Sequence, residues 1–141
     1  MKPTDIDAVA DRLARQQFGV FARWQLLERG VHPDAIARRL RRRRWIAVDS
    51  GVYVLPSHPR SWLQRAMAAS LGQTASVLGG RAGAALWQVG GIERRGPIEL
   101  VVPLGAHHHS RIARVRRSQR IERRVIDGIP VNSPPLILLD L

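Results

Sequence analysis

The chain has 141 residues, of which 45% are hydrophobic and 24% charged, and its formal net charge is +12. This length suits one ordinary domain or two small ones, and the composition is that of a globular rather than a disordered protein. No apolar run approaches the roughly 18 residues that a spanning helix needs, so we expect no membrane partner.

The positive charge is concentrated in two segments. Residues 1–37 carry five basic and five acidic residues, which cancel. Residues 38–44 then add six arginines without an acid, and residues 111–124 add seven arginines against Glu122 alone. Such clusters favour a polyanionic partner and indicate binding surfaces rather than generally raised solubility. The absence of cysteine is compatible with a cytoplasmic location, and the acidic N-terminus is unlike a secretory leader.

The first part of the chain predicts two short amphipathic helices with a short strand at residues 20–21 between them. The N-terminal helix is expected to be capped by Thr4, to show apolar residues at helical spacing and to end at Gly19. The second helix, over residues 22–29, ends at Gly30, because glycine is favoured just beyond a helix. Its expected core residues are Phe21 or Trp24, Leu26 and Leu27.

A third helix and a β-hairpin follow. Pro33 stands at the first helical position, where its missing N–H costs nothing. Residues 36, 37 and 40 are expected to face the core, and Arg38, Arg41 and Arg42 to face solvent. The runs 45–48 and 52–55 around a Ser-Gly turn predict a hairpin. Three helices followed by a hairpin are typical of a winged helix-turn-helix, which we assign to residues 1–58.

Residues 59–141 predict a second, small α/β domain, so the expected fold class is α+β. Pro56 and Pro59 separate it from the first. Its expected helices cover 62–71 and 81–89, and its expected strands cover 77–78, 97–103, 112–116, 123–126 and 129–131. A final apolar helix starts near residue 136 and lacks any stop signal, so we expect the sequence to be truncated.

Several strings carry a family resemblance in their joint order and spacing. They are Arg38-Arg39-Leu40, Trp45-Ile46-Ala47-Val48, Gly51-Val52-Tyr53, Ala84-Ala85-Leu86-Trp87, residues 127–134 and Leu138-Leu139-Asp140-Leu141. In this order the chain resembles the AbiEi family of type IV toxin–antitoxin antitoxins, especially its actinobacterial members. The resemblance covers nearly the whole chain.

The resemblance implies a winged helix-turn-helix followed by an α/β antitoxin domain. It also implies a protein that represses its own operon and counteracts a nucleotidyltransferase-like toxin, without a stable toxin complex. Relatives often carry a further domain resembling very-short-patch-repair endonucleases, which is absent here. They usually show Ser-His-Arg-Ser where this chain has Gly79-Gly80-Arg81-Ala82, so a role tied to that serine and histidine does not transfer.

The arginine run is the main candidate for contact with DNA. We expect base-edge contacts from Arg38, Arg41 or Arg42, because an arginine fork binds guanine with two hydrogen bonds. We expect phosphate contacts from Arg39, Arg43 and Arg44, with Arg43 turning back toward the buried side of the helix. Ser50, at the tip of the hairpin, either touches the DNA or only satisfies the turn.

Other candidates are weaker. Trp45 and Tyr53 are expected to be core residues rather than base-stacking residues. Arginines 111–124 are either protection for an edge strand or a second nucleic-acid contact, and both interpretations stay open. The members of this second contact would be Arg111, Arg114, Arg116 and Arg117. The run His107–His109 is expected to be a polar loop rather than a metal site, because no cysteine or carboxylate completes a ligand shell.

No catalytic motif is visible, and no cofactor or metal is expected. Carboxylates are scattered, the only lysine is Lys2, and no glycine-rich phosphate loop precedes a helix. The chain is therefore expected not to be an enzyme, and to bind double-stranded DNA of its own promoter as an antitoxin and repressor. The alternatives are an RNA-binding module, or the targeting half of a nuclease whose catalytic domain lies outside this sequence.

Overall fold

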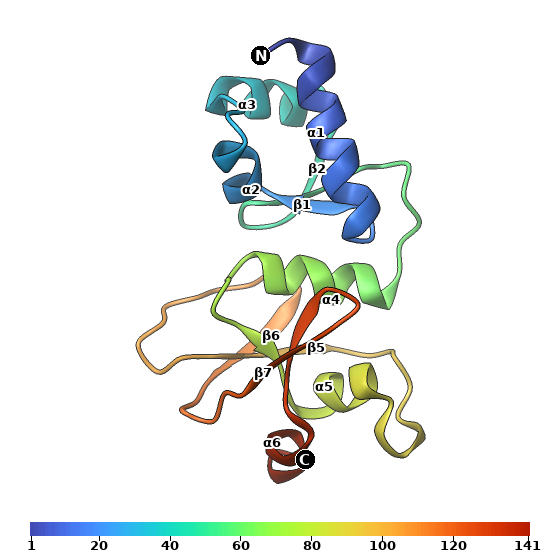
Figure 1. Cartoon of the computed structure of the whole chain (residues 1–141), viewed down its shortest axis with the longest axis vertical. Helices are drawn as coiled ribbons and strands as arrows, with labels where there is room; N and C mark the ends of the chain where they lie inside the picture. Colours follow the sequence, from blue (N-terminus) through green and yellow to red (C-terminus); the bar gives the residue numbers. More distant parts are fainter.

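The computed structural model describes residues 1–141 and shows an α+β protein built from two lobes (Figure 1). The N-terminal lobe, residues 1–58, lies at the top of Figure 1. Its elements are α1 (Pro3–Gln16), β1 (Val20–Ala22), α2 (Arg23–Glu28), α3 (Pro33–Arg41), β2 (Ile46–Asp49) and β3 (Val52–Val54). The strands form an antiparallel sheet in the order β1-β3-β2, so the predicted hairpin is confirmed.

The C-terminal lobe, residues 59–141, is a five-stranded mixed sheet between two layers of helix. Its elements are α4 (Trp62–Leu71), β4 (Val77–Leu78), α5 (Gly80–Trp87), the 3-10 turn η1 (Val89–Gly91), β5 (Ile98–Val102), β6 (Ala113–Arg117), β7 (Arg123–Ile126), β8 (Ile129–Asn132) and α6 (Pro134–Leu139). The strand order is β6-β5-β4-β8-β7, and only the β5–β6 and β4–β8 pairs are parallel. Helix α4 covers one face of this sheet, and α5 and α6 cover the other (Figure 1).

The first two helices differ in detail from the sequence-based expectation. Helix α1 is preceded by Lys2 as its cap, with Pro3 at the first position, so Thr4 is not the cap. In α2 the buried residues are Gln25 and Leu26, whereas Trp24 and Leu27 are about 40% exposed. Gln25 is buried because its amide accepts from the Ala22 N–H and exchanges hydrogen bonds with Gln17.

An aromatic cluster forms the centre of the smaller core, in the N-terminal lobe. Phe21, Trp45 and Tyr53 are at most 5% exposed. The Phe21 ring stands edge-on to the other two, and its centroid lies 5.0 Å from that of Trp45 and 6.1 Å from that of Tyr53. Edge-to-face packing of this kind is a favourable arrangement of aromatic rings. The expectation that Trp45 and Tyr53 are core residues is confirmed.

Helix α4 joins the two lobes, because it packs against both sheets. Eight of its ten residues are buried. The larger core contains Val20, Val52 and Val54 from the N-terminal lobe together with α4 and the five-stranded sheet. A helix enclosed on several sides must be apolar around most of its circumference. The three alanines Ala66, Ala68 and Ala69 meet this need and allow close approach of both sheets.

Polar contacts also connect the lobes. The indole N–H of Trp24 donates to the carbonyl of Leu71 at 3.0 Å, and the Gln64 amide donates to the carbonyl of Phe18 at 2.9 Å. The Asp49 carboxylate, 2% exposed at the end of β2, accepts from the Ser110 hydroxyl at 2.6 Å and from the Arg111 N–H at 3.0 Å. The boundary between residues 58 and 59 stays a prediction, but the two halves share the larger of the two cores.

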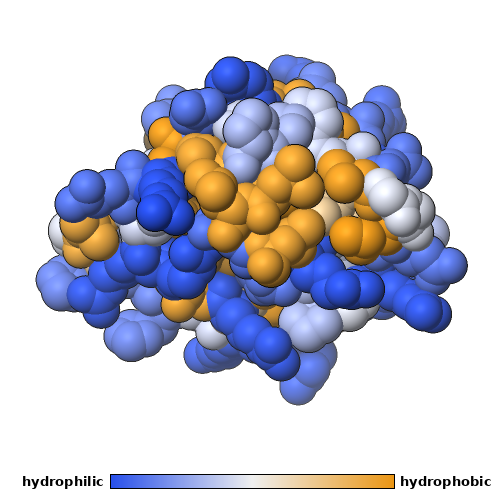
Figure 2. Space-filling model, turned by 90° about the horizontal axis from the view of Figure 1, so that it is seen from below, coloured by the Kyte–Doolittle hydropathy of each residue, from blue (hydrophilic) through white to orange (hydrophobic).

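The two ends of the molecule have different surfaces. Helix α3 lies near one end, and α6 lies at the other (Figure 1). Seen from below, the second end shows an apolar patch surrounded by hydrophilic residues (Figure 2). The exposed leucines of this region are Leu138, Leu139 and Leu141. No helix of the protein combines the length and the apolar character needed to cross a membrane.

Candidate nucleic-acid interface

Helix α3 presents one apolar and one basic face. His32 caps it, and the His32 Nδ1 accepts a hydrogen bond from the Asp34 N–H. Ile36 is fully buried, while Ala37 and Leu40 are half-buried. Arg38, Arg41 and Arg42, on the other side of the helix, are exposed, as the periodicity predicts.

The exposed arginines of this helix have no protein partner. The guanidinium groups of Arg38, Arg41 and Arg42 take part in no ion pair and in no side-chain hydrogen bond within the protein. The only acidic residue of α3 is Asp34, at its opposite end. The three guanidinium groups lie on one face and are unpaired, so their N–H donors are available for phosphates or base edges.

Arg39 does not belong to this face, and its predicted role as a phosphate contact is wrong. It is 5% exposed, and its Nε lies 2.9 Å from the Asp7 carboxylate of α1. Its other nitrogens donate to the carbonyls of Pro3 and Ala35, and its guanidinium lies 5.4 Å from the centre of the Trp45 ring. The Asp7 carboxylate and the two carbonyls occupy the donors of the buried Arg39 guanidinium, so Arg39 holds α3 against α1 instead.

Arg44 is divided between the same carboxylate and solvent. Its Nη2 lies 3.1 Å from the second oxygen of Asp7, and just over half of its side chain is exposed. Asp7 therefore holds one buried and one exposed arginine. The exposed face of Arg44 remains available to a phosphate, so its predicted contact stays a prediction.

Arg43 ends the helix in an unusual backbone conformation. Its φ is +54°, in the left-handed region that favours glycine. The Arg43 N–H donates to the carbonyl of Leu40, and the Arg44 N–H to the carbonyl of Arg39, which is the hydrogen-bond pattern of a Schellman motif. Arg43 is exposed rather than turned toward the buried side, because the left-handed residue redirects the chain outward.

Helix α2 ends in the same motif, with a different residue. Gly30 has a φ of +83°. The Gly30 and Val31 N–H groups donate to the carbonyls of Leu27 and Leu26. Four residues, 29–32, separate α2 from α3, so the two helices are joined by a tight turn of the kind that helix-turn-helix proteins contain. The predicted stop at Gly30 is confirmed.

Ser50 is exposed at the tip of the β2–β3 hairpin. Its N–H donates to the Asp49 carboxylate at 2.8 Å, and the next residue, Gly51, has a φ of +66°. These features are what the turn itself requires. Its contact with DNA stays a prediction.

The second group of arginines lies on the two edges of the five-stranded sheet. Strand β6 is one edge and β7 is the other, so residues 111–124 do not form a single patch. Arg111, Arg114 and Arg117 are exposed on or before β6. The Arg116 Nη2 lies 2.8 Å from the Asp140 carboxylate of α6, and Arg123 donates to the carbonyls of Thr74 and Ser76. Several members of the group therefore hold the fold together.

Two other segments, the histidine run 107–109 and the glycines at the start of α5, show no arrangement of side chains that would bind an ion. No three histidine, cysteine or carboxylate side chains lie close enough together to hold a metal ion. At the start of α5, Gly80 has a φ of +54°, and the Glu99 carboxylate occupies the space that a Cβ would take. A carboxylate at this helix start argues against an anion there.

These features define an α+β protein whose N-terminal lobe carries a basic helix. Among solved structures, the chain is similar to the crystal structure of the RV2827C protein from Mycobacterium tuberculosis, with a TM-score of 0.50 and 19% identity. The match covers 99% of this chain and 60% of that one, so the chain spans about three fifths of its length. No family model matches the chain, and no curated protein does. The likeness supports the fold.

Proposed function

We propose that the protein binds double-stranded DNA through a winged helix-turn-helix formed by its N-terminal lobe. The observation that carries the proposal is the set of free arginines Arg38, Arg41 and Arg42 on the outer face of α3. In helix-turn-helix proteins the second helix of the motif enters the major groove and the first crosses the backbone. Helix α3 occupies that place after α2 and the turn at Gly30.

The hairpin supports this assignment. Strands β2 and β3 follow α3 directly and pair antiparallel, and Ser50 is exposed at their tip. In a winged helix the hairpin lies beside the recognition helix and touches the DNA backbone or the minor groove. Arg43 and Arg44, between α3 and β2, are exposed and would bind backbone phosphates.

We further propose the role of an antitoxin that represses its own operon. This part rests on the order of the strings that resemble AbiEi antitoxins, from Arg38-Arg39-Leu40 to Leu138-Leu139-Asp140-Leu141. The partners would be double-stranded DNA of its own promoter and, functionally, a nucleotidyltransferase-like toxin, in the cytoplasm. The chain itself is proposed not to be an enzyme.

Two other functions would use the same basic surface. Common RNA-binding modules stack bases on pairs of exposed aromatic rings or hold the backbone with a Gly-x-x-Gly loop, a sequence that no loop of this chain contains. The aromatic cluster of the N-terminal lobe is instead buried. A targeting half of a nuclease would also bind DNA, and its catalytic carboxylates would lie outside residues 1–141. DNA binding is therefore the first property to test.

The test is fluorescence anisotropy with three labelled ligands of equal length: a duplex from the gene's own promoter, a scrambled duplex and a single-stranded RNA. Binding to duplex DNA should weaken as salt rises, with log K falling by about 0.9 per phosphate contact against log salt. Arg15→Ala removes an exposed arginine in the last turn of α1, and is the matched control for variants of the α3 arginines. A flat salt dependence, or equal binding to RNA, would refute the DNA assignment.

A further inference from the structure

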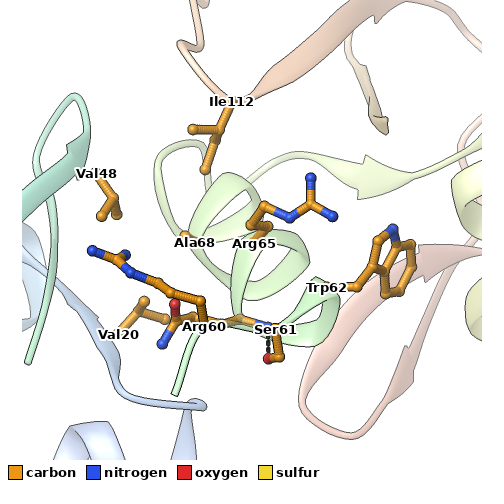
Figure 3. Close-up of a pocket in the computed structure, with 9 residues that line it drawn as sticks. Val20, Val48, Arg60, Ser61, Trp62, Arg65, Ala68 and Ile112 are labelled. Carbon is orange, nitrogen blue, oxygen red and sulfur yellow. Dashed lines mark hydrogen bonds between the residues drawn. The ribbon is translucent and has the colours of Figure 1, made fainter. Parts of the chain in front are cut away.

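A cavity of about 550 Å³ lies at the junction of the two lobes (Figure 3). Val20 of β1 and Val48 of β2 line it from the N-terminal lobe. Ala68 of α4 and Ile112, just before β6, line it from the C-terminal lobe. Its volume is within the range of small-molecule binding sites, which are mostly apolar with a few polar groups.

A bulge in the hairpin brings Val48 to this cavity. Ala47 pairs with Tyr53 and Asp49 pairs with Val52, so Val48 is an extra residue in β2. A bulge of this kind re-aims side chains. As a result, Val48 packs against the larger core while Asp49 turns to Ser110 and Arg111.

Two arginines line the same cavity and are free to bind an anion. Arg60 extends from the segment before α4, and Arg65 from α4 itself (Figure 3). Both are exposed, and neither takes part in an ion pair or in a side-chain hydrogen bond within the protein. No acidic residue lines the cavity, and the Gln64 amide is already bound to the carbonyls of Phe18 and Pro59. The cavity thus combines an apolar interior with uncompensated positive charge.

We propose that this cavity binds a small amphipathic carboxylate. Its apolar part would lie between Val48, Ala68 and Ile112. Its carboxylate would accept hydrogen bonds from Arg60 or from Arg65, whose guanidinium groups lie on opposite sides of the cavity (Figure 3). Arginine and carboxylate form charge-assisted hydrogen bonds, often in pairs, which gives the site its preference for anions. Neutral or cationic molecules of the same apolar size lack these bonds.

The position of the cavity connects such a ligand to the hairpin. Val48 is next to Asp49, and Ile112 is two residues from Ser110, so an occupant would contact sequence neighbours of both partners in the Asp49–Ser110 hydrogen bond. Filling the cavity would change how the hairpin is held against the C-terminal lobe. This step rests on the proposed DNA-binding function, whereas the binding of the carboxylate does not.

Isothermal titration calorimetry of the full chain tests the site without DNA. Sodium decanoate below its micelle concentration should bind with one molecule per chain, whereas decyltrimethylammonium should not bind. The variant Arg60→Gln/Arg65→Gln should weaken decanoate binding about tenfold or more, because it removes the charge-assisted bonds. Arg12→Gln, at an exposed arginine of α1 outside the cavity, should leave it unchanged.

A second pair of variants distinguishes a specific loss of decanoate binding from a loss caused by altered structure. Val48→Glu places a carboxylate where it pairs with the arginines and repels the ligand, so decanoate binding should be lost. Ala47→Glu adds the same charge at the neighbouring exposed position and should bind decanoate like the wild type. Unchanged melting temperatures without ligand establish that the variants fold. Absence of saturable binding, equal binding of the cationic analogue, or equal effects of the two glutamates would overturn the proposal.

The connection to DNA is measured separately. Saturating decanoate should shift the anisotropy midpoint for the promoter duplex at least threefold in the wild type and not in Val48→Glu. If calorimetry shows that decanoate binds but the midpoint does not shift, the coupling to DNA binding is overturned and the carboxylate site itself is retained. If duplex binding itself fails, the calorimetry still decides whether the site exists.

Discussion

The two arginine-rich segments of this protein are alike in sequence and differ in structure. Residues 38–44 are on a single helix and the turn after it, so four of the six arginines reach solvent on neighbouring positions with no acidic partner. Residues 111–124 are divided between strands at opposite edges of a five-stranded sheet. Strands are about 4.8 Å apart, so these edges are separated by roughly 19 Å. A run of charged residues can form one binding surface only where the fold brings the side chains onto the same face.

The largest expected effect separates the two segments by their DNA affinity. Arg38→Ala/Arg42→Ala should lower affinity for the promoter duplex about 100-fold, because each lost arginine–base contact costs about 1–3 kcal/mol. Affinity for a scrambled duplex should fall much less. The matched variant Arg114→Ala/Arg117→Ala removes two exposed arginines of β6 and should change neither affinity more than about threefold. Similar losses for both variants in anisotropy would show that the edge strand belongs to the interface.

The next effect distinguishes two neighbours within the first segment by how much each contributes to the free energy of unfolding. Arg39→Ala should lower the free energy of unfolding by about 2–3 kcal/mol, because Asp7 loses its buried partner and the Pro3 carbonyl loses a donor. Arg38→Ala should change it by less than about 0.5 kcal/mol, since Arg38 is exposed and unpaired. Urea denaturation followed by circular dichroism measures both. Equal losses would mean that Arg39 is not the residue that holds α3 to α1.

Arg44 should show the behaviour of a phosphate contact. Arg44→Ala should weaken promoter and scrambled duplex by similar factors, and reduce the slope of log K against log salt by about 0.9. The preference between the two duplexes should stay as in the wild type. If the preference falls as it does for Arg38→Ala/Arg42→Ala, then Arg44 contacts bases instead. Anisotropy at four salt concentrations gives both quantities.

The smallest effect concerns Arg43 and its positive φ. Arg43→Gly should raise the free energy of unfolding by about 0.5–1 kcal/mol, because glycine adopts the left-handed conformation without strain. The same variant should weaken duplex binding a fewfold through loss of one charge. Gly30→Ala, in the same motif at the end of α2, should do the reverse and destabilise the protein. A destabilised Arg43→Gly would exclude strain at this residue.

Much of the element pattern was predictable, because local signals decided it. The helix at 62–71 and the strands at 77–78 and 123–126 have the predicted bounds, since proline, glycine and alternating apolar residues define them. The face of α3 with its exposed arginines also follows from helical periodicity. These features depend only on residues near each other in sequence.

The sequence-based predictions fail where contacts between residues far apart in sequence determine the structure. As a member of the arginine run, Arg39 is predicted to contact a phosphate. It lies at −60° from Ile36 on the helical wheel, however, close enough to the core for Asp7 to reach it. Only the pairing with α1, 32 residues away, makes its burial favourable. Likewise, the separation of arginines 111–124 onto opposite edges depends on strand order, which no local pattern contains. The junction cavity and the Asp49–Ser110 bond connect positions 61 residues apart.

Helix α4 has a consequence for how modular the N-terminal lobe is. Val20, Val52 and Val54 are fully buried or nearly so only because α4 covers the outer face of their sheet. Transplanting residues 1–58 onto another protein would leave this apolar face in water unless the recipient supplied a helix with small residues at the same place. The lobe and α4 are therefore expected to be inherited, exchanged and engineered as one segment ending near residue 71.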